Sequence, residues 1–291
     1  MKKYVFILFA LIGSIHMTIT PYHTREWDAH TYAQGNQMQE SAALHFLHKY
    51  GINFTNKKVL DVGCGIGNIS VIVAQTAEHV HGIDASNNMI GCAKGRYSHV
   101  PNVSFEHAYV EDFTAQELFD AAYSFFCLHW VPDKKSALTQ VNMALELNGE
   151  FFGALHTDCG KEPMRITIIR HMMPLLEEQC LSCGKDLLDE MLATYTHDQE
   201  FRNMFNETGF ELISYEYESQ EYIKTKEEIE LFQKPIIMSF ATVQAMPQKT
   251  QEWFFKTYID LFLTQLPQNN EGNYILKKSS TVFYARKIAD V

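Results

Sequence analysis

The chain has 291 residues, of which 46% are hydrophobic and 20% are charged, so it can form one large domain or two modest ones. Its 24 Lys and Arg against 35 Asp and Glu give a formal net charge of −11, which disfavours nucleic acid and anionic membrane surfaces as partners. Its 6 cysteines are too few for a disulfide scaffold, and the single CxxC of Cys180 and Cys183 lacks the second ligand pair of a structural zinc site, so no metal is expected.

Residues 1–16 form an apolar segment that begins with Lys2 and Lys3. A basic start before a short apolar run resembles a secretory signal, but the run is shorter than the ~20 residues of a membrane-spanning helix and no small-residue cleavage site follows. Met17 offers an alternative translation start. We therefore expect a cytoplasmic protein, with a secreted or membrane-tethered protein as the alternative.

The first predicted helix is amphipathic and covers Ser41 to Tyr50, because its apolar residues fall mostly on one stripe. The preceding residues 32–39 are polar, and this segment could fold over a pocket.

A strand–turn–helix–strand unit follows. Val59 to Val62 is a short apolar run that stops at a glycine-rich turn, residues 68–75 have a helical pattern, and Val80 to Asp84 is a second short strand. This order is typical of a βαβ unit with parallel strands.

Strands and helices continue to alternate as far as residue 156. Strands are predicted over 103–108, 119–128 and 150–156, and helices over 87–97 and 134–145, the latter closed by Asn148 and Gly149. Such alternation predicts a parallel sheet covered by helices on both faces.

Beyond about residue 157 the pattern becomes mainly helical. Helices are predicted within 160–208 and 226–266, with a strand over 211–222 and two strand-like stretches within 274–288. Two helical insertions among the last strands predict a cap above the sheet. We expect this cap to carry most of the aromatic residues of the second half, including Phe201, Phe205 and Phe232.

The glycine turn is the strongest chemical signal. Gly63, Gly65 and Gly67 allow a sharp turn and a close approach of the backbone to a ligand at the carboxyl end of a strand. In the dinucleotide fingerprint G-x-G-x-x-G the third glycine falls where this chain has Asn68. Asp61, inside the preceding strand, is a poor neighbour for pyrophosphate but a good acceptor for a cationic amine.

Acidic residues also follow the next two predicted strands. Asp84 ends the second strand, where a carboxylate can accept hydrogen bonds from ribose hydroxyls. Glu111 and Asp112 follow the third strand and could accept from an adenine amino group, with Val110 or Phe113 against the ring. These positions together predict an adenosine-type ligand.

These residues resemble the class I S-adenosylmethionine-dependent methyltransferases. Residues 59–67 are similar to the first motif of that family, residues 82–84 to its second-strand acid and residues 110–113 to its adenine-side motif. The resemblance implies a Rossmann-like, seven-stranded, mostly parallel sheet with an antiparallel last strand and S-adenosylmethionine as cofactor. It assigns the following residues to the cofactor site: Asp61, Gly63, Cys64, Gly65, Gly67, Asp84, Ala85, Glu111, Asp112 and Phe126.

A narrower resemblance starts at residues 123–131. The sequence Leu128-His129-Trp130 is similar to a motif of the juvenile hormone acid and trans-aconitate methyltransferases and of the malonyl-carrier-protein methyltransferase, which esterify free carboxylates. Asn36-x-x-Gln39 resembles an N-terminal motif of the juvenile hormone group, in which the Gln contacts the acid. The resemblance therefore implies catalytic or substrate-contacting roles for Trp130, Gln39 and His129.

A carboxylate acceptor sets modest chemical demands. It is ionised at pH 7 and needs no general base, only donors that orient it in a site without water. The indole N–H of Trp130 and the amide of Gln39 are such donors, and His129 could add a hydrogen bond, or act as a base for a hydroxyl acceptor. Arg165 and Arg170 could pair with a second carboxylate, although exposed arginines are more often simply solvated.

The predicted organisation is an apolar N-terminal segment at 1–16, a cofactor-binding core at 17–157, and a helical cap plus the last two strands at 158–291. The expected activity is O-methylation of a small carboxylic acid to its methyl ester. Hydroxyl, amine and carbon acceptors remain open, as do a nicotinamide-dependent oxidoreductase and a binding protein without catalysis. No stable membrane partner is expected, and the acceptor and the oligomeric state are not determined by the sequence.

Overall fold

The computed structural model describes residues 26–157, 163–178, 183–194 and 196–291. The apolar segment at 1–16 and Cys180 of the CxxC pair lie outside the described residues. Within the described part of the chain, no helix combines the length and the apolar character needed to cross a bilayer. The same residues contain no cluster of three or more His, Cys, Asp or Glu side chains placed to hold a metal ion.

The described residues form a single sheet of seven strands in the order β3-β2-β1-β4-β5-β7-β6. The strands are β1 (Lys58–Val62), β2 (His79–Asp84), β3 (Val103–His107), β4 (Phe119–Phe125), β5 (Leu145–Leu155), β6 (Phe210–Lys224) and β7 (Tyr274–Lys287). The pairs among β1 to β5 are parallel, and β7 runs antiparallel to both β5 and β6. The predicted mostly parallel α/β sheet is therefore confirmed.

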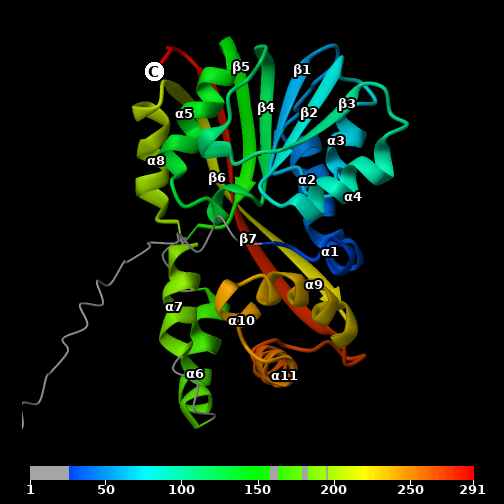
Figure 1. Cartoon of the computed structure of the whole chain (residues 1–291), viewed down its shortest axis with the longest axis vertical. Helices are drawn as coiled ribbons and strands as arrows, with labels where there is room; N and C mark the ends of the chain where they lie inside the picture. The colour runs from blue at the N-terminus through cyan, green and yellow to red at the C-terminus, as the bar shows by residue number, and fades with distance from the viewer. Residues whose placement is uncertain (1–25, 158–162, 179–182, 195) are drawn as a thin grey trace, which may run out of the picture.

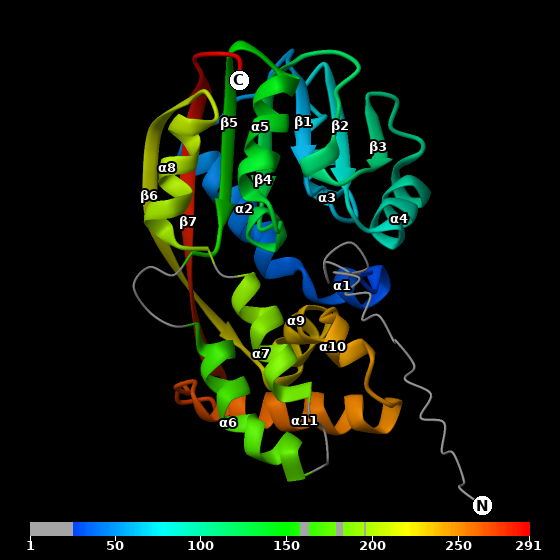
Figure 2. The ribbon, with the colours of Figure 1, turned by 60° about the vertical axis from the view of Figure 1, so that its left-hand side comes forward.

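The helices lie on the two faces of this sheet and in a cap (Figures 1 and 2). Those near one face are α2 (Gln37–Lys49), α3 (Asn68–Val73) and α4 (Asn87–Tyr97), and those on the other are α5 (Lys134–Ala144) and α8 (Asp198–Glu207). The cap contains α6 (Met164–Glu178), α7 (Cys183–Ala193), α9 (Lys226–Met238), α10 (Ala241–Gln244) and α11 (Gln248–Thr264). Helix α1 (Ala29–Gly35) lies between the sheet and the cap.

The cap is built from the two predicted insertions, one between β5 and β6 and one between β6 and β7. It has its own apolar core, in which residues of α6 and α7 pack against residues of α9 and α11. Helix α8 is the exception, because its buried Phe201 and Phe205 pack against Phe283 of β7 and so belong to the core of the sheet. Their expected place in the cap was wrong: an amphipathic stripe shows that a face is buried, not which partner covers it.

Residues 32–39, for which no secondary structure was predicted, form part of α1 and the start of α2. Two local predictions differ from the structure. Asn148 and Gly149 were expected to close the helix, but strand β5 begins directly after α5. Asn148, with a positive φ of 69°, therefore lies inside β5, just before the residues that pair with β4 from Glu150 onward. The chain ends in one continuous strand, β7, instead of two stretches.

Candidate active site

The glycine turn joins β1 to α3 and packs tightly against neighbouring strands. Gly63, Gly65 and Gly67 all have positive φ angles, of 79°, 55° and 82°. A Cβ on Gly63 would lie 2.3 Å from the Cβ and Sγ of Cys127, and one on Gly67 would lie 2.6 Å from the ring of Phe105. Both the backbone conformation and the surrounding atoms therefore require glycine at these two positions.

Asp84 at the end of β2 fixes this turn. Its Oδ2 accepts a hydrogen bond from the backbone N–H of Gly65, and its Oδ1 accepts one from the N–H of Ser86, each at 2.9 Å. The carboxylate is half-buried, and burial raises its pKa above the usual value although both N–H donors favour the charged form. Asp84 is thus a partly desolvated acid held beside the turn.

Asp61 lies on β1 below the turn and is buried, with 3% of its surface exposed. Its Oδ2 accepts hydrogen bonds from the Ser70 hydroxyl at 2.6 Å and from the Tyr123 hydroxyl at 2.7 Å. Burial nevertheless raises the pKa of Asp61 to about 7. A cation bound beside this carboxyl group would therefore favour its ionised form.

This ionisation predicts how stability depends on pH. The folded-state pKa of Asp61 lies above its unfolded value, so the unfolded chain binds fewer protons between about pH 4 and 7 and stability falls as pH rises through that window. Asp61→Asn cannot ionise but keeps an oxygen acceptor for Ser70 and Tyr123. Without added ligand, we expect the variant to melt a few degrees above the wild type at pH 8 in thermal denaturation. Asp112→Asn, at an exposed site, is the matched control, and an Asp61→Asn protein that melts lower at pH 8 would contradict this reading.

Two adjoining pockets lie on either side of the turn and share Tyr32, Gln39, Gly63, Gly65, Phe125 and Phe126. The first also has Asp84, Ala85, Glu111, Cys127 and Trp130 in its walls, and the second has Asp61, Cys64 and Glu40. None of the described residues that line either pocket is Lys, Arg or His. This crevice is acidic, so its charge suits a cationic ligand and opposes a pyrophosphate.

Aromatic residues close the end of the crevice that faces the cap. The Trp130 ring packs edge-on against Trp27, with 5.4 Å between ring centroids, and Trp27 packs against Tyr32 at 5.9 Å. The preceding Glu26 holds this segment on α4: its carboxylate accepts hydrogen bonds from the Ser86 hydroxyl at 2.7 Å and from two backbone N–H groups at the start of the helix. Residues 26–39 therefore form one wall of the crevice.

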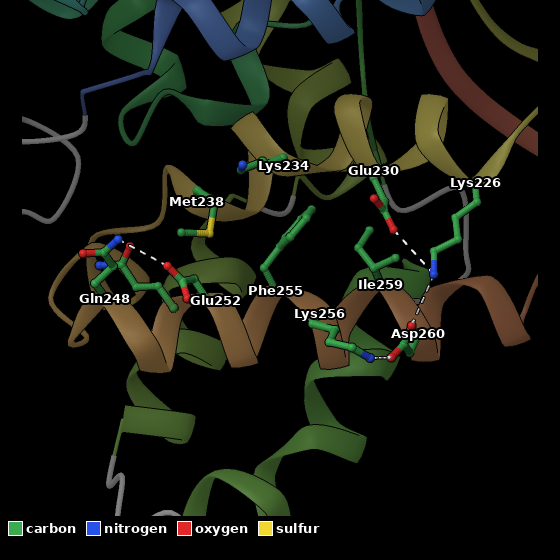
Figure 3. Close-up of a pocket in the computed structure, with 11 residues that line it drawn as sticks. Lys226, Glu230, Lys234, Met238, Gln248, Glu252, Phe255, Lys256, Ile259 and Asp260 are labelled. Carbon is green, nitrogen blue, oxygen red and sulfur yellow. Dashed lines mark hydrogen bonds and ion pairs between the residues drawn. The ribbon is translucent and has the colours of Figure 1, made fainter.

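A separate groove lies on the outer side of the cap, between α9 and α11 (Figure 3). Its charged groups neutralise one another, since Lys226 contacts Glu230 and Asp260, and Lys256 contacts Asp260. No buried or strongly shifted acid–base group lines it among the described residues. The crevice beside the glycine turn is therefore the stronger candidate for the active site of the two.

Comparisons with known proteins agree with this location. Residues 59–149 match the family described as Methyltransferase domain. The chain is 22% identical to the juvenile hormone acid O-methyltransferase of Drosophila melanogaster, over 89% of this chain and 92% of that one, and 28% identical to a trans-aconitate 2-methyltransferase of an Enterobacter species, over 43% and 48%. The solved phosphoethanolamine N-methyltransferase 2 of Haemonchus contortus in complex with S-adenosyl-L-methionine shares the fold, with a TM-score of 0.53, 18% identity and coverage of 86% of this chain and 53% of that one.

Residues 59–149 thus form a methyltransferase domain, and the relatives and the fold support a class I S-adenosylmethionine-dependent methyltransferase. The residues present fit this cofactor. A sulfonium nucleoside is cationic, and the described lining residues of the crevice include carboxylates but no Lys, Arg or His. At the position of the third glycine of a dinucleotide fingerprint, Asn68 bonds instead to Glu40 of α2 and to the Tyr97 hydroxyl of α4.

Most of the predicted site residues of the methyltransferase line the two pockets. Those in the walls are Gln39, Asp61, Gly63, Cys64, Gly65, Asp84, Ala85, Glu111, Phe126 and Trp130. Gly67, Asp112 and His129 are not among the lining residues: Gly67 packs on Phe105, and Asp112 is exposed. His129 is buried behind Trp130, with its ring centroid 5.1 Å from the Trp130 ring, and burial lowers its pKa well below the usual range. It is therefore neutral at pH 7.

The structure adds lining residues that the sequence patterns missed. Trp27, Ser86, Met89 and Tyr109 all face the first pocket, next to Tyr32 of the 32–39 segment that was expected to fold over a pocket. The Asn-x-x-Gln resemblance drew attention to the N-terminal segment, but nothing in the pattern singled out its aromatic residues. In contrast, Val110 and Phe113, expected against an adenine ring, are buried in the sheet core, and Tyr109 lies in the pocket instead.

Proposed function

We propose that this methyltransferase transfers a methyl group to the carboxylate of a small organic acid and forms a methyl ester. The observation that carries the proposal is the pairing of two hydrogen-bond donors, Gln39 and Trp130, in the walls of a crevice that has no His, Lys or Arg among its described lining residues. Similarity to juvenile hormone acid and trans-aconitate methyltransferases supports it. A hydroxyl or amine acceptor would need a group that removes a proton, and His129, the nearest histidine by sequence, is buried behind Trp130.

In this proposal the protein residues bind and orient. Asp84 accepts from the ribose hydroxyls, Glu111 lies on the adenine side, and Asp61 faces the cationic amino-acid end of the cofactor. S-adenosylmethionine supplies a methyl group already activated on a positive sulfur. Gln39 and Trp130 donate hydrogen bonds that hold one carboxylate oxygen of the acceptor, while Trp27, Tyr32 and Phe126 exclude water.

The direct test is a screen of organic acids with S-adenosylmethionine, with methyl esters detected by mass spectrometry. We expect ester formation from carboxylic acids and none from alcohols or amines of the same carbon skeleton. Methylation of the alcohol or amine series alone would reject the proposal.

Trp130→Phe tests the role of the indole N–H. The variant keeps an aromatic ring against Trp27 and Phe240 but loses the donor, so kcat/KM for the acid should fall about 10- to 100-fold, the equivalent of one hydrogen bond to a charged group. The affinity for S-adenosylmethionine, measured by calorimetry, should change little. Trp253→Phe makes the same chemical change at a partly buried residue packed against the core of the cap and is the matched control. A Trp130→Phe enzyme with unchanged turnover would mean that the indole does not hold the acceptor.

A further inference from the structure

Four basic side chains converge on the cap side of Trp130. Arg165 comes from α6, Lys278 from β7, His156 from the end of β5 and His129 from the short 3₁₀ turn at Leu128–Trp130. The guanidinium carbon of Arg165 lies 5.5 Å from the Trp130 ring centroid, and the His129 and His156 ring centroids are 5.0 Å apart. These residues are far apart in the sequence, so only the packing of the cap on the sheet brings them together.

Lys278 is the least compensated member of this basic cluster. Its ammonium lies 4.4 Å from the centroid of the Phe232 ring, and among the described residues no carboxylate forms an ion pair with it. Burial, with a further contribution from the positive charge of Arg165, lowers the pKa of Lys278 to about 7. Lys278 is half-buried, and an ammonium partly shielded from water with only an aromatic partner is costly; the cost is removed by loss of the proton or by arrival of an anion.

The two histidines do not offset this charge. Burial and the nearby positive charges of Arg165 and Lys278 lower the pKa of both His129 and His156, so both rings are neutral at pH 7. His156 Nδ1 is 3.1 Å from the carbonyl oxygen of Ser279, whereas His129 Nδ1 is buried and has no hydrogen-bond partner, with 2% of the residue exposed. Within the described part of the chain, the basic cluster therefore contains a buried nitrogen without a hydrogen-bond partner, His129 Nδ1, and a cation without a carboxylate partner, Lys278.

The basic cluster is separated from the cofactor crevice by the thickness of one aromatic ring. Trp130 lines the crevice and contacts Arg165, and Phe126 also lines the crevice with its ring centroid 5.4 Å from that of His156. On the cap side, Phe232 and Phe240 supply apolar surface next to Lys278 and Trp130. An acceptor that reaches from Trp130 into the cap would place its far end near Arg165 and Lys278.

We propose that Arg165 and Lys278 bind a second anionic group of the acceptor, whose first carboxylate is methylated at Gln39 and Trp130. This inference rests on the proposed function and makes the acceptor a dicarboxylic acid, or a carboxylic acid with another anionic group at its far end. Binding of the second anion at Arg165 and Lys278 would also decide which end of the molecule meets the methyl donor. The anionic end stays bound to these two cations, and the opposite carboxylate is the one that is methylated.

The experiment compares acids that differ only at the far end. The probes are saturated α,ω-dicarboxylic acids of increasing length, the monocarboxylic acids of the same length, and ω-phosphonocarboxylic acids. For the best length, kcat/KM for the diacid should exceed that for the monoacid by at least about tenfold, as expected for one charge-assisted hydrogen bond. A preference for the phosphono acid over the monoacid would support the same site with a phosphate-like anion as its ligand.

In the variant Lys278→Met, the ratio of kcat/KM for the diacid to that for the monoacid should fall by at least about tenfold. Lys278→Arg should retain most of this ratio because the charge remains. The matched control is Lys277→Met, whose side chain is exposed and paired with Glu221 on the opposite face of β7, and it should leave the preference unchanged. For α6, Arg165→Gln is compared with the exposed Arg170→Gln in the same way. Thermal melting of each variant verifies that it is folded.

A pH series provides a readout that a merely structural lysine would not move. Since Lys278 must be protonated to hold an anion, the diacid-to-monoacid ratio of the wild type should fall as pH rises above about 7. Arg165 stays charged throughout and His129 and His156 stay neutral, so the change belongs to Lys278. The ratio for Lys278→Arg should not change over the same range.

The outcomes separate the two proposals. Equal kcat/KM for diacids and monoacids, with no effect of Lys278→Met, would overturn the second anion site and leave ester formation intact. If no acid is methylated, yet a diacid binds the complex with S-adenosylhomocysteine in calorimetry and Lys278→Met weakens that binding, the anion site stands and the proposed function is wrong.

Discussion

Replacing Asp84 with alanine should weaken S-adenosylmethionine binding by at least about 100-fold, because one carboxylate is expected to serve both the cofactor and the loop that contacts it. In the structure Asp84 accepts hydrogen bonds from the N–H groups of Gly65 and Ser86. The alanine variant leaves both donors without their acceptor and removes the proposed partner of the ribose. Calorimetric titration with S-adenosylmethionine measures the change directly.

Asp112→Ala is the control for this result. The two residues are both acids that follow strands of the same sheet, but Asp112 is exposed and is not among the residues that line the crevice. Its substitution should change the dissociation constant by less than about threefold, as for a surface residue. An effect of Asp84→Ala as small as that of Asp112→Ala would place the sugar of the cofactor elsewhere.

Replacing Gly63 with alanine should cost about 3 kcal/mol or more of unfolding free energy, the sum of backbone strain and a forced contact. The residue has a φ of 79°, and the added methyl group would lie 2.3 Å from the Cβ and Sγ of Cys127, a residue that itself faces the crevice. The turn must therefore shift, and S-adenosylmethionine binding should be lost with it. Urea denaturation gives the free energy, and calorimetry gives the binding.

The variant Gly272→Ala separates the cost of backbone strain from the cost of the forced contact with Cys127. Gly272 has nearly the same backbone conformation, with a φ of 81°, but no atom lies within 4 Å of its added Cβ. Its substitution should cost only the strain, about 1–2 kcal/mol, and should leave cofactor binding unchanged. If the two variants were equally stable, the contact with Cys127 would not constrain the turn.

The cofactor half of the fold was predictable because its signals are local. The glycine turn, the run of apolar residues in Val59–Val62 and the acid at Asp84 each lie within one βαβ unit, and parallel strands necessarily bring their carboxyl ends to one edge of the sheet. The same rule placed Glu111 beside Asp84 in one pocket although no single segment contains both.

The acceptor half was less predictable because it depends on tertiary packing. Arg165 could be recognised as a charge near the end of β5, but its contact with Trp130 and its proximity to Lys278 arise only when α6 and β7 meet. Phe201 and Phe205 illustrate the same limit. Their helical spacing identified a buried face correctly, and the sheet rather than the cap covers it.

Strands β6 and β7 extend well beyond the rest of the sheet and into the cap (Figure 2). Their pairing runs from Phe210 with Lys287 to Lys224 with Tyr274, with one register shift between Leu212 and Ser214, whereas β5 pairs with β7 only over Thr281–Arg286. One unbroken strand thus carries both the sheet core and Lys278. In the proposed acceptor site, β7 sets the distance between the sheet core and Lys278, with a spacing of roughly 3.3 Å per residue. In that proposed site, selectivity for acceptor length can therefore change by exchange of side chains in α9 and α11, while the distance along β7 stays constant.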